Sequence, residues 1–390
     1  MQHSRQTYCA GAAFDFLLRA LPAMKRIVAE GRESHADQDF AGTVIRWQKQ
    51  HGRHRLPWQR TRDAYRIWLS EIMLQQTQVS TVIPYYERFV ERFPDVAALA
   101  CAPVEDVMAH WSGLGYYTRA RNLHRCAQQV VAIHAGRFPD DVEVLASLPG
   151  IGRSTAAAIS AFAYGTRAAI LDGNVKRVLC RVFGIAGFPG VSAVEKELWE
   201  RAEALLPAQD IESYTQGLMD LGATVCTRTR PRCDECPLRQ RCVARASGRT
   251  HELPERKPRK SVPEKSTVML LVLHESAILL EQRPPSGIWG GLLSLPELER
   301  LNSVSSPRLS RRALFRALSE FGEIVTYDPL PEFTHAFTHF KLNVSPVRIT
   351  LGKAFMRAGQ SVYEWRPIAS LKDAPLPAPV RKLLESLRVG

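Results

Sequence analysis

The stretch LPGIGRSTA (residues 148–156) indicates a turn between two helices in the N-terminal half of this 390-residue chain. It joins a helical segment that ends near Leu145 to another that starts near Ser154. Gly150 and Gly152, two residues apart, permit a tight turn with positive φ. Such a turn points successive N–H groups and the start of the next helix outward, which suits phosphate binding without any base contact. A G-x-G spacing alone also occurs in ordinary helix–helix turns.

The net charge of the chain points to a polyanionic partner. Lys and Arg total 52 against 39 Asp and Glu, which gives a formal charge of +13 and an isoelectric point near 9.6. Such an excess is typical of proteins that bind nucleic acid or an anionic membrane surface. Taken with this charge, the G-x-G turn resembles the helix-hairpin-helix of DNA-binding proteins.

The hydropathy of the chain argues against a membrane protein. No run of 18 uninterrupted apolar residues exists, so we expect no spanning helix. Charged residues interrupt the apolar patch in the first 26 residues, which is unlike a secretory signal. We therefore expect a soluble intracellular protein whose cysteines are reduced unless something ligates them.

Hydrophobic periodicity changes along the chain. Up to residue 225, apolar residues recur at spacings of three and four, which predicts consecutive helices. Beyond residue 262, alternating patterns predict strands and one helix. The helices are expected at 39–49, 64–80, 82–92, 104–111, 119–134, 142–147, 154–164, 174–183, 193–205 and 311–318. The strands are expected at 267–273, at 277–283 after a tight turn, and within 337–351.

These patterns predict a multi-domain protein with an all-α domain and a C-terminal α+β domain. Residues 1–35 are interpreted as an N-terminal extension and residues 36–244 as the helical domain. Residues 245–262 are polar, basic and Pro-containing, which is the composition of an interdomain linker. Residues 263–390 then form the α+β domain.

The cysteines provide a second signal. Four of the eight fall within 17 residues as C-x6-C-x2-C-x5-C, at Cys226, Cys233, Cys236 and Cys242. Four thiolates that close a short loop suit a tetrahedral zinc ion or an iron–sulfur cluster, and the spacing leaves both open. The same loop carries five cations, which predict a phosphate-facing surface: Arg228, Arg230, Arg232, Arg239 and Arg241.

The first candidate catalytic carboxylate is Glu71, in the stretch IWLSEIMLQQTQ (67–78). Its neighbours at helical spacing include Ile67 and Trp68, so we expect Glu71 to be half-buried. Desolvation disfavours the anion and should raise the pKa of Glu71. A carboxyl group that is protonated near neutral pH can act as a general acid. The alternative is an exposed glutamate on a rotated helix.

The second candidate carboxylate is Asp172, in LDGNVKRVL (171–179). It stands where the N-cap of a buried helix would stand, so capping is the alternative reading. An ionised Asp172 beside a protonated Glu71 would form the two-role pair that cleaves glycosidic bonds. Lys176, Arg177 and Arg181 follow on the helix, and we expect this face to contact phosphate.

Several motifs in order resemble the endonuclease III superfamily and, within it, the MutY family of adenine DNA glycosylases. The resemblance covers about residues 38–385. It is carried by the four-cysteine pattern and by SEIMLQQTQV (70–79), WSGLGYYTRARNL (111–123), LPGIGRSTA (148–156) and LDGNVKRVL (171–179). It implies a helix-hairpin-helix glycosylase domain in which Gly150, Gly152, Ser154 and Lys176 lie at the DNA.

The resemblance also implies a reaction. Glu71 would protonate N7 of a flipped adenine, and Asp172 would stabilise the oxocarbenium-like sugar before water attacks. Asn174 would help to orient that site. The partner would be double-stranded DNA with 8-oxoguanine:adenine or guanine:adenine mispairs. The protein would act as a monomer. It would be located in the bacterial cytoplasm, or in the nucleus or mitochondrion if the source is a eukaryote. One 4Fe–4S cluster would be the cofactor, bound by Cys226, Cys233, Cys236 and Cys242.

Four further residues receive roles from the resemblance. Gln76 and Tyr116 are expected to wedge into the base stack near the orphaned base. Core packing is expected for one residue of the pair Tyr116–Tyr117. Trp58 would line the adenine pocket. Ser154 stands where nicking members of the superfamily carry a Schiff-base lysine, so we expect base excision without efficient strand cleavage.

The C-terminal domain resembles the Nudix-like domain of the same glycosylases through GIWGGL (287–292). Nudix hydrolases bind Mg²⁺ through several glutamates on one helix, whereas the corresponding segment RRALFRALSEFG (311–322) holds only Glu320. The domain should therefore bind rather than hydrolyse. The family reads 8-oxoguanine with a Phe-Ser-His loop, which corresponds to Phe337, Thr338 and His339.

Two other functions compete with this one. Ser154 and the second domain argue against a nicking enzyme for oxidised pyrimidines. A catalytically inactive DNA-binding adaptor is counted against by the presence of both Glu71 and Asp172.

Overall fold

The computed structural model describes residues 40–257, 262–285, 287–302, 310–337, 339–355, 362–372 and 374–386. The described residues form two compact units. The first unit comprises residues 40–64, 140–146 and 152–257, and the second comprises 65–139, 147–151 and the described residues from 262 onward. The predicted extension, residues 1–35, lies outside the described part of the chain.

The first unit is helical. Its helices include the five predicted around residues 39–49, 142–147, 154–164, 174–183 and 193–205, and α11, which was not predicted. Pattern and structure agree there because each of these segments has an apolar stripe at helical spacing. The elements are a helix over 40–51, α7 (Val142–Ser147), α8 (Arg153–Tyr164), α9 (Gly173–Phe183), α10 (Ser192–Ala204), α11 (Ile211–Asp220), a π-helical turn η2 (Leu221–Val225) and α12 (Val243–Ala246).

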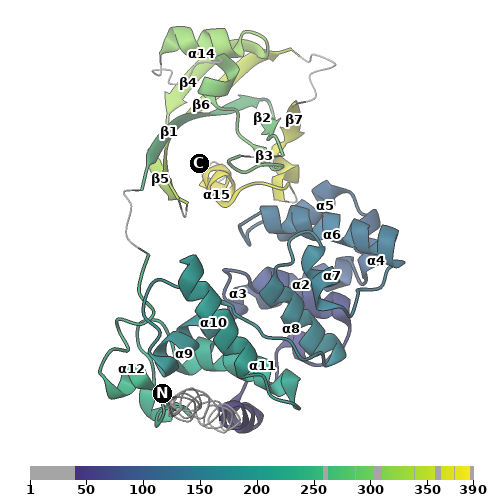
Figure 1. The fold of residues 1–390 in the computed structure, drawn as a ribbon. Coiled ribbons are helices and arrows are strands. Elements are labelled where there is room, and N and C mark those ends of the chain that lie inside the picture. The colour runs from purple at the N-terminus through teal and green to yellow at the C-terminus, as the bar shows by residue number, and fades with distance from the viewer. Residues whose placement is uncertain are drawn as a thin grey trace, which may run out of the picture. The chain divides into compact units, whose positions relative to one another are not determined.

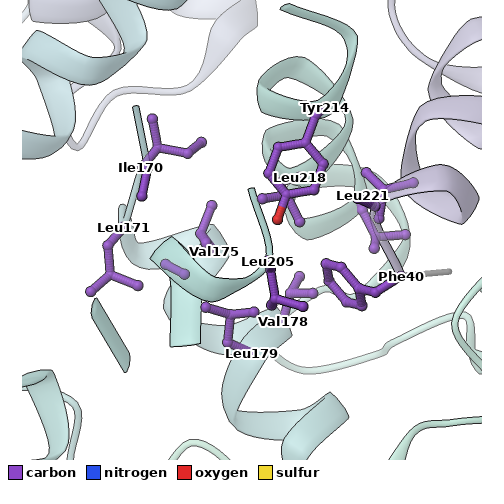
Figure 2. Packing of buried hydrophobic residues seen from close by; sticks show 14 of the residues in the cluster. Phe40, Ile170, Leu171, Val175, Val178, Leu179, Leu205, Tyr214, Leu218 and Leu221 are labelled. Carbon is purple, nitrogen blue, oxygen red and sulfur yellow. The ribbon is translucent and has the colours of Figure 1, made fainter. Parts of the chain in front are cut away.

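The core of the first unit forms around α9. Val178 and Leu179 of this helix are fully buried and pack in one cluster with Phe40, Leu205 and Leu218 (Figure 2). Each such side chain contributes about 1.5–3 kcal/mol when it leaves water. The cluster fixes the orientation of α9 and therefore of the residues at its N-terminus.

The helices of the second unit carry one correction to the predicted pattern. The helix expected over 64–80 ends at Leu74, and Gln76 has a φ of 58° in the left-handed region. The apolar spacing continues past the point where the backbone leaves the helix, so periodicity alone overestimated its length. The helices are α2 (Ala64–Leu74), α3 (Val79–Arg92), the unpredicted α4 (Val96–Cys101), α5 (Val104–Trp111) and α6 (Thr118–His134).

The second unit also contains a mixed sheet. Within the described residues the strands follow the order β3-β2-β1-β6-β4, with β5 paired to β6 and β7 paired to β2. β1 and β6 run parallel, whereas β1 and β2 form the predicted antiparallel hairpin. The strands are β1 (Glu264–His274), β2 (Ala277–Gln282), β3 (Leu293–Ser294), β4 (Gly322–Pro329), β5 (Phe333–Ala336), β6 (Lys341–Ala354) and β7 (Tyr363–Pro367).

Three helices accompany the sheet: α13 (Leu298–Asn302), α14 (Arg311–Leu318) and α15 (Ala378–Ser386). α14 covers one face of the sheet (Figure 1), where Leu314 and Leu318 pack against Leu270 and Ile349. α14 ends at Leu318, so Glu320 follows the helix instead of lying on it as expected. The predicted all-α and α+β parts are both confirmed. Among the described residues, none of the helices has the length and apolar character needed to cross a membrane.

Candidate active site and cysteine loop

The predicted hairpin forms between α7 and α8. Gly150 has a φ of +80°, and the N–H of Ile151 donates to the carbonyl of Leu148 at 3.1 Å. Gly152 has a φ of −93°, so only the first of the two glycines needs the left-handed region. Gly152 is the N-cap of α8, and a Cβ added there would meet no described atom within 4 Å. An approaching phosphate would find the start of α8 uncovered by a side chain.

Asp172 is the N-cap of α9. Its carboxylate accepts a hydrogen bond from the N–H of Val175 at 2.8 Å and another from Asn174 Nδ2 at 3.1 Å. Burial raises the pKa of Asp172 above its ordinary 3.8, and these hydrogen bonds oppose the shift. The capping alternative is therefore true, but capping leaves the carboxylate only partly buried and available for a second role.

Ser154 contributes to the same region. Its hydroxyl accepts a hydrogen bond at 2.9 Å from the N–H of Leu171, the residue before Asp172. Ser154 thereby ties the first turn of α8 to the segment that delivers the carboxylate. Nothing in the sequence indicated this contact, because the two residues are 17 positions apart.

Asn174 connects the carboxylate to a second structural element. Its Oδ1 accepts a hydrogen bond from Arg177 Nη2 at 2.8 Å. Arg177 also donates to the carbonyls of Gly222 and Cys226, both at 2.7 Å. A Cβ at Gly222 would lie 2.5 Å from the Cβ of Asn174, so only glycine allows this approach. The π-helical turn η2 thus packs directly against the Asp172 site.

The four cysteines of the segment 226–242, called the cysteine loop below, line one cavity together with Val178, Leu221 and Leu238. Four thiols around an apolar cavity are a suitable donor set for a metal cofactor. Among the described residues, no group of three or more His, Cys, Asp or Glu side chains is arranged to hold a metal ion. The shared cavity makes the cysteine loop a candidate site for a metal cofactor.

The structure corrects one expectation about basic residues. Arg177 and Arg181 were expected on a phosphate-contacting face, yet Arg181 is only 2% exposed. Its guanidinium donates to the carbonyls of Thr227 and Leu253 and to the sulfur of Cys226. Both arginines hold the cysteine loop against α9, because the loop supplies carbonyls that satisfy a buried guanidinium.

Lys176 is half-buried on α9. Its ammonium lies 2.5 Å from the carboxylate of Glu195 on α10. A phosphate contact by Lys176 would therefore compete with this ion pair. That role stays a prediction.

Glu71 lies in the last turns of α2, in the second unit. It is half-buried, and Ile67 and Trp68 one turn earlier are buried, which confirms the expected degree of burial. Asp172 belongs to the first unit. That the two carboxyl groups act on one substrate stays a prediction.

Gln76 and Tyr116 lie at one cavity of about 230 Å³, together with Asn122, Pro149 and Gly150. Tyr116 is 44% exposed and Tyr117 is half-buried, so one tyrosine of the pair packs inward, as predicted. The hairpin glycine and the two expected wedge residues thus share one surface hollow. Gln76 and Tyr116 were expected at the same part of the base stack, whereas the position of Gly150 beside them was not predicted.

Trp58 lies in a 3₁₀ turn (Pro57–Gln59) and is 7% exposed. The segment before it is anchored by Arg53, whose Nε lies 2.6 Å from the fully buried carboxylate of Asp220. Whether Trp58 lines a base pocket stays a prediction.

The predicted reading loop, residues 337–339, connects β5 to β6. The ring of Phe337 stacks on Phe340 with centroids 4.3 Å apart, and Trp289 lies 5.9 Å from Phe337. His339 is exposed. Thr338 lies outside the described residues.

Comparisons with known proteins extend this description. Residues 69–204 match the family described as HhH-GPD superfamily base excision DNA repair protein, and residues 267–386 match the NUDIX domain. The adenine DNA glycosylase of Buchnera aphidicola subsp. Acyrthosiphon pisum is 35% identical over 352 residues, which are 90% of this chain and 97% of that protein. The adenine DNA glycosylase of Homo sapiens is 35% identical over 365 residues, and the match covers 78% of this chain and 65% of that protein.

A solved structure supports the helical part. The structure of a thermostable thymine-DNA glycosylase aligns with 56% of this chain and 99% of its own, with a TM-score of 0.50 and 29% identity. The first family match contains the positions of Glu71 and Asp172. The similarity to the bacterial relative extends over both the helical and the α+β parts. The chain is therefore a DNA glycosylase and belongs to the family of adenine DNA glycosylases.

Proposed function

We propose that the protein binds double-stranded DNA, flips out adenine mispaired with 8-oxoguanine or guanine, and excises it hydrolytically in base excision repair. The observation that carries this proposal is the placement of Asp172, a partly buried carboxylate fixed at the start of α9 by Val175 and Asn174. A carboxylate fixed in this way can stabilise positive charge on a sugar without prior reorganisation.

The proposed reaction uses two carboxyl groups. Glu71 donates a proton to N7 of the flipped adenine, and the bond from C1′ to N9 breaks with its electron pair retained by the purine. The anionic Asp172 stabilises the oxocarbenium-like sugar until water adds at C1′ and loses a proton. Asn174 keeps the Asp172 carboxylate in one orientation, which its hydrogen bond at 3.1 Å supports.

We propose that excision occurs without efficient strand cleavage. A serine cannot form a Schiff base with C1′, and the hydroxyl of Ser154 is already engaged with the N–H of Leu171. In this proposal Ser154 acts by fixing the segment that carries Asp172.

The cysteine loop is proposed to bind one 4Fe–4S cluster. Zinc bound by four thiolates at about 2.3 Å would hold the sulfurs in a compact tetrahedron, whereas a polynuclear cluster holds them further apart. The shared cavity supports a bound metal cofactor, and the resemblance to the endonuclease III superfamily favours the cluster over zinc. The cluster would cross-link the four cysteines of the loop. Arg177 and Arg181 of α9 donate hydrogen bonds to carbonyls of the loop and so hold it against the helix.

DNA contacts are proposed at three places. The start of α8, with Gly150 and Gly152 before it, would bind a phosphate of the strand that holds the adenine. Lys176 would contact a neighbouring phosphate. Gln76 and Tyr116 would enter the base stack from the cavity that they share with the hairpin.

The α+β domain is proposed to read the base opposite the adenine through Phe337, Thr338 and His339. The buried acid Glu281 of this domain is paired with arginine: it lies 2.6 Å from Arg300 Nε and 3.6 Å from Arg283 Nη1. Carboxylates paired in this way are poor ligands for Mg²⁺, which supports binding over hydrolysis. The expected monomeric state and cytoplasmic location stay predictions.

The test is incubation with a duplex that contains 8-oxoguanine:adenine, followed by alkali. Breakage of the adenine strand only after alkali is the expected result, with an 8-oxoguanine:cytosine duplex as the control. Breakage before alkali would support the nicking enzyme. Binding with no breakage under either condition would support the inactive adaptor. A visible absorption band and about four iron atoms per chain would support the cluster against zinc.

A further inference from the structure

Arg119, near the start of α6, joins two segments that meet at the proposed wedge. Its Nη1 donates to the carbonyls of Ile72, Met73 and Gln75 at 2.7–2.9 Å, at the end of α2. Its Nη2 donates to Thr77 Oγ1 at 3.1 Å, to the carbonyl of Leu114 at 3.3 Å and to that of Gly115 at 3.1 Å. One guanidinium therefore bridges residues 72–77 and residues 114–115.

Each bridged segment contains one residue with unusual backbone geometry. Gln76 has a φ of 58° and Tyr116 has a φ of 50°, in the left-handed region that residues with a Cβ rarely adopt. Arg119 binds both neighbours of Gln76, and it binds the residue before Tyr116. Strain of this kind persists only where surrounding contacts over-determine the backbone.

The surroundings of Arg119 are those of a fixed, charged core residue. It is 9% exposed, and its guanidinium carbon lies 5.2 Å from the ring centroid of Trp111 and 5.5 Å from that of Tyr116. Burial lowers the pKa of Arg119 to about 10, a shift that Tyr116 opposes, so the side chain remains a cation at neutral pH. Trp111 also donates to the Gly115 carbonyl at 3.1 Å, which fixes the loop a second time.

We propose that Arg119 is a positioning residue that holds Gln76 and Tyr116 as one preformed wedge before DNA binds. This inference rests on the proposed function, because it assumes that both side chains enter the base stack. A planar fork of donors can bind both segments at once, whereas the compact ammonium of lysine cannot span them. Without the bridge, each segment can relax from its left-handed residue, and the wedge would have to reassemble on the DNA.

The test measures base unstacking by the wedge. Glu71→Gln is the parent protein, so that no adenine is released, and the probe is a duplex with 2-aminopurine stacked beside the guanine of a guanine:adenine pair. In the parent, saturating protein should raise the fluorescence, and an adenine:thymine duplex should show little change. Adding Arg119→Lys should reduce the amplitude at saturation at least about threefold. Adding Arg125→Lys, a change at an exposed arginine of the same helix, should leave the amplitude unchanged.

A merely structural role for Arg119 predicts a different result. In that case Arg119→Lys would lower the melting temperature but leave the fluorescence amplitude at saturation equal to that of the parent. This outcome would overturn the proposal. If Arg119→Lys does not fold, Thr77→Val decides the question, since it removes one of the six acceptors and should still reduce the amplitude measurably. A parent without any lesion-dependent rise contradicts the proposed function itself, together with the wedge.

Discussion

Replacing Asp172 by Asn or by Ala should separate its capping role from its catalytic role. The N–H of Val175 donates a hydrogen bond to the Asp172 carboxylate at 2.8 Å. Asparagine retains an oxygen that can accept this hydrogen bond but loses the negative charge. The alanine loses the cap and also leaves Asn174 Nδ2 without this acceptor. Adenine release should therefore fall at least about 10³-fold in both variants, because both lack the anion opposite the developing cation.

The two variants should differ in stability. Loss of an N-cap costs about 1 kcal/mol, and loss of the Asn174 hydrogen bond costs about 1 kcal/mol more. Asp172→Ala should then be about 2 kcal/mol less stable than the unmodified protein. Asp172→Asn keeps the cap and no longer buries a charge, so its loss should be about 1 kcal/mol or less.

The pH dependence has a defined sign. Because burial raises the pKa of Asp172 above 3.8, the folded chain holds this proton more tightly than the unfolded chain. The stability contributed by this group therefore falls as pH rises from about 3.8 through the folded pKa. Adenine release needs the anion, so the acid limb of the rate profile should lie above pH 3.8. Asp172→Asn should lack the stability trend.

The assay is single-turnover adenine release from an 8-oxoguanine:adenine duplex, read as alkali-dependent strand breakage, with urea unfolding on the same preparations. If Asp172→Asn releases adenine at a rate within tenfold of that of the unmodified protein, an anion is not needed at this position. Equal stability losses in the two variants would refute the capping account.

Three other changes test different parts of the molecule. Glu71→Gln should abolish adenine release while binding to the lesion duplex is retained; release at a near-normal rate, measured in the same assay, would remove Glu71 as the acid. Alanine at both Thr338 and His339 should reduce the ratio of excision rates opposite 8-oxoguanine and opposite guanine, and an unchanged ratio would remove the loop as the reader. Gly222→Ala should lower stability by about 1–3 kcal/mol and slow adenine release, because its Cβ would lie 2.5 Å from that of Asn174; normal values of both would show that η2 does not support the site.

Sequence patterns predicted the features that depend on spacing along the chain. The stripe of Val178 and its neighbours predicted α9, and the position of Asp172 before it predicted the cap that the structure contains. Periodicity failed at the end of α2, where the apolar pattern continues but the chain turns at Gln76. There the backbone is decided by Arg119, which binds carbonyls from two separate segments.

The same contrast applies to the candidate site as a whole. The helical class, the G-x-G hairpin, the two carboxylates and the set of four cysteines could be read from sequence, because each depends on residues close together in the chain. Which arginines face inward follows from the folded structure alone. The guanidinium groups of Arg119, Arg177 and Arg181 satisfy carbonyls of distant segments. A long cationic side chain is buried only where folding supplies enough acceptors, and those acceptors come from elsewhere in the chain.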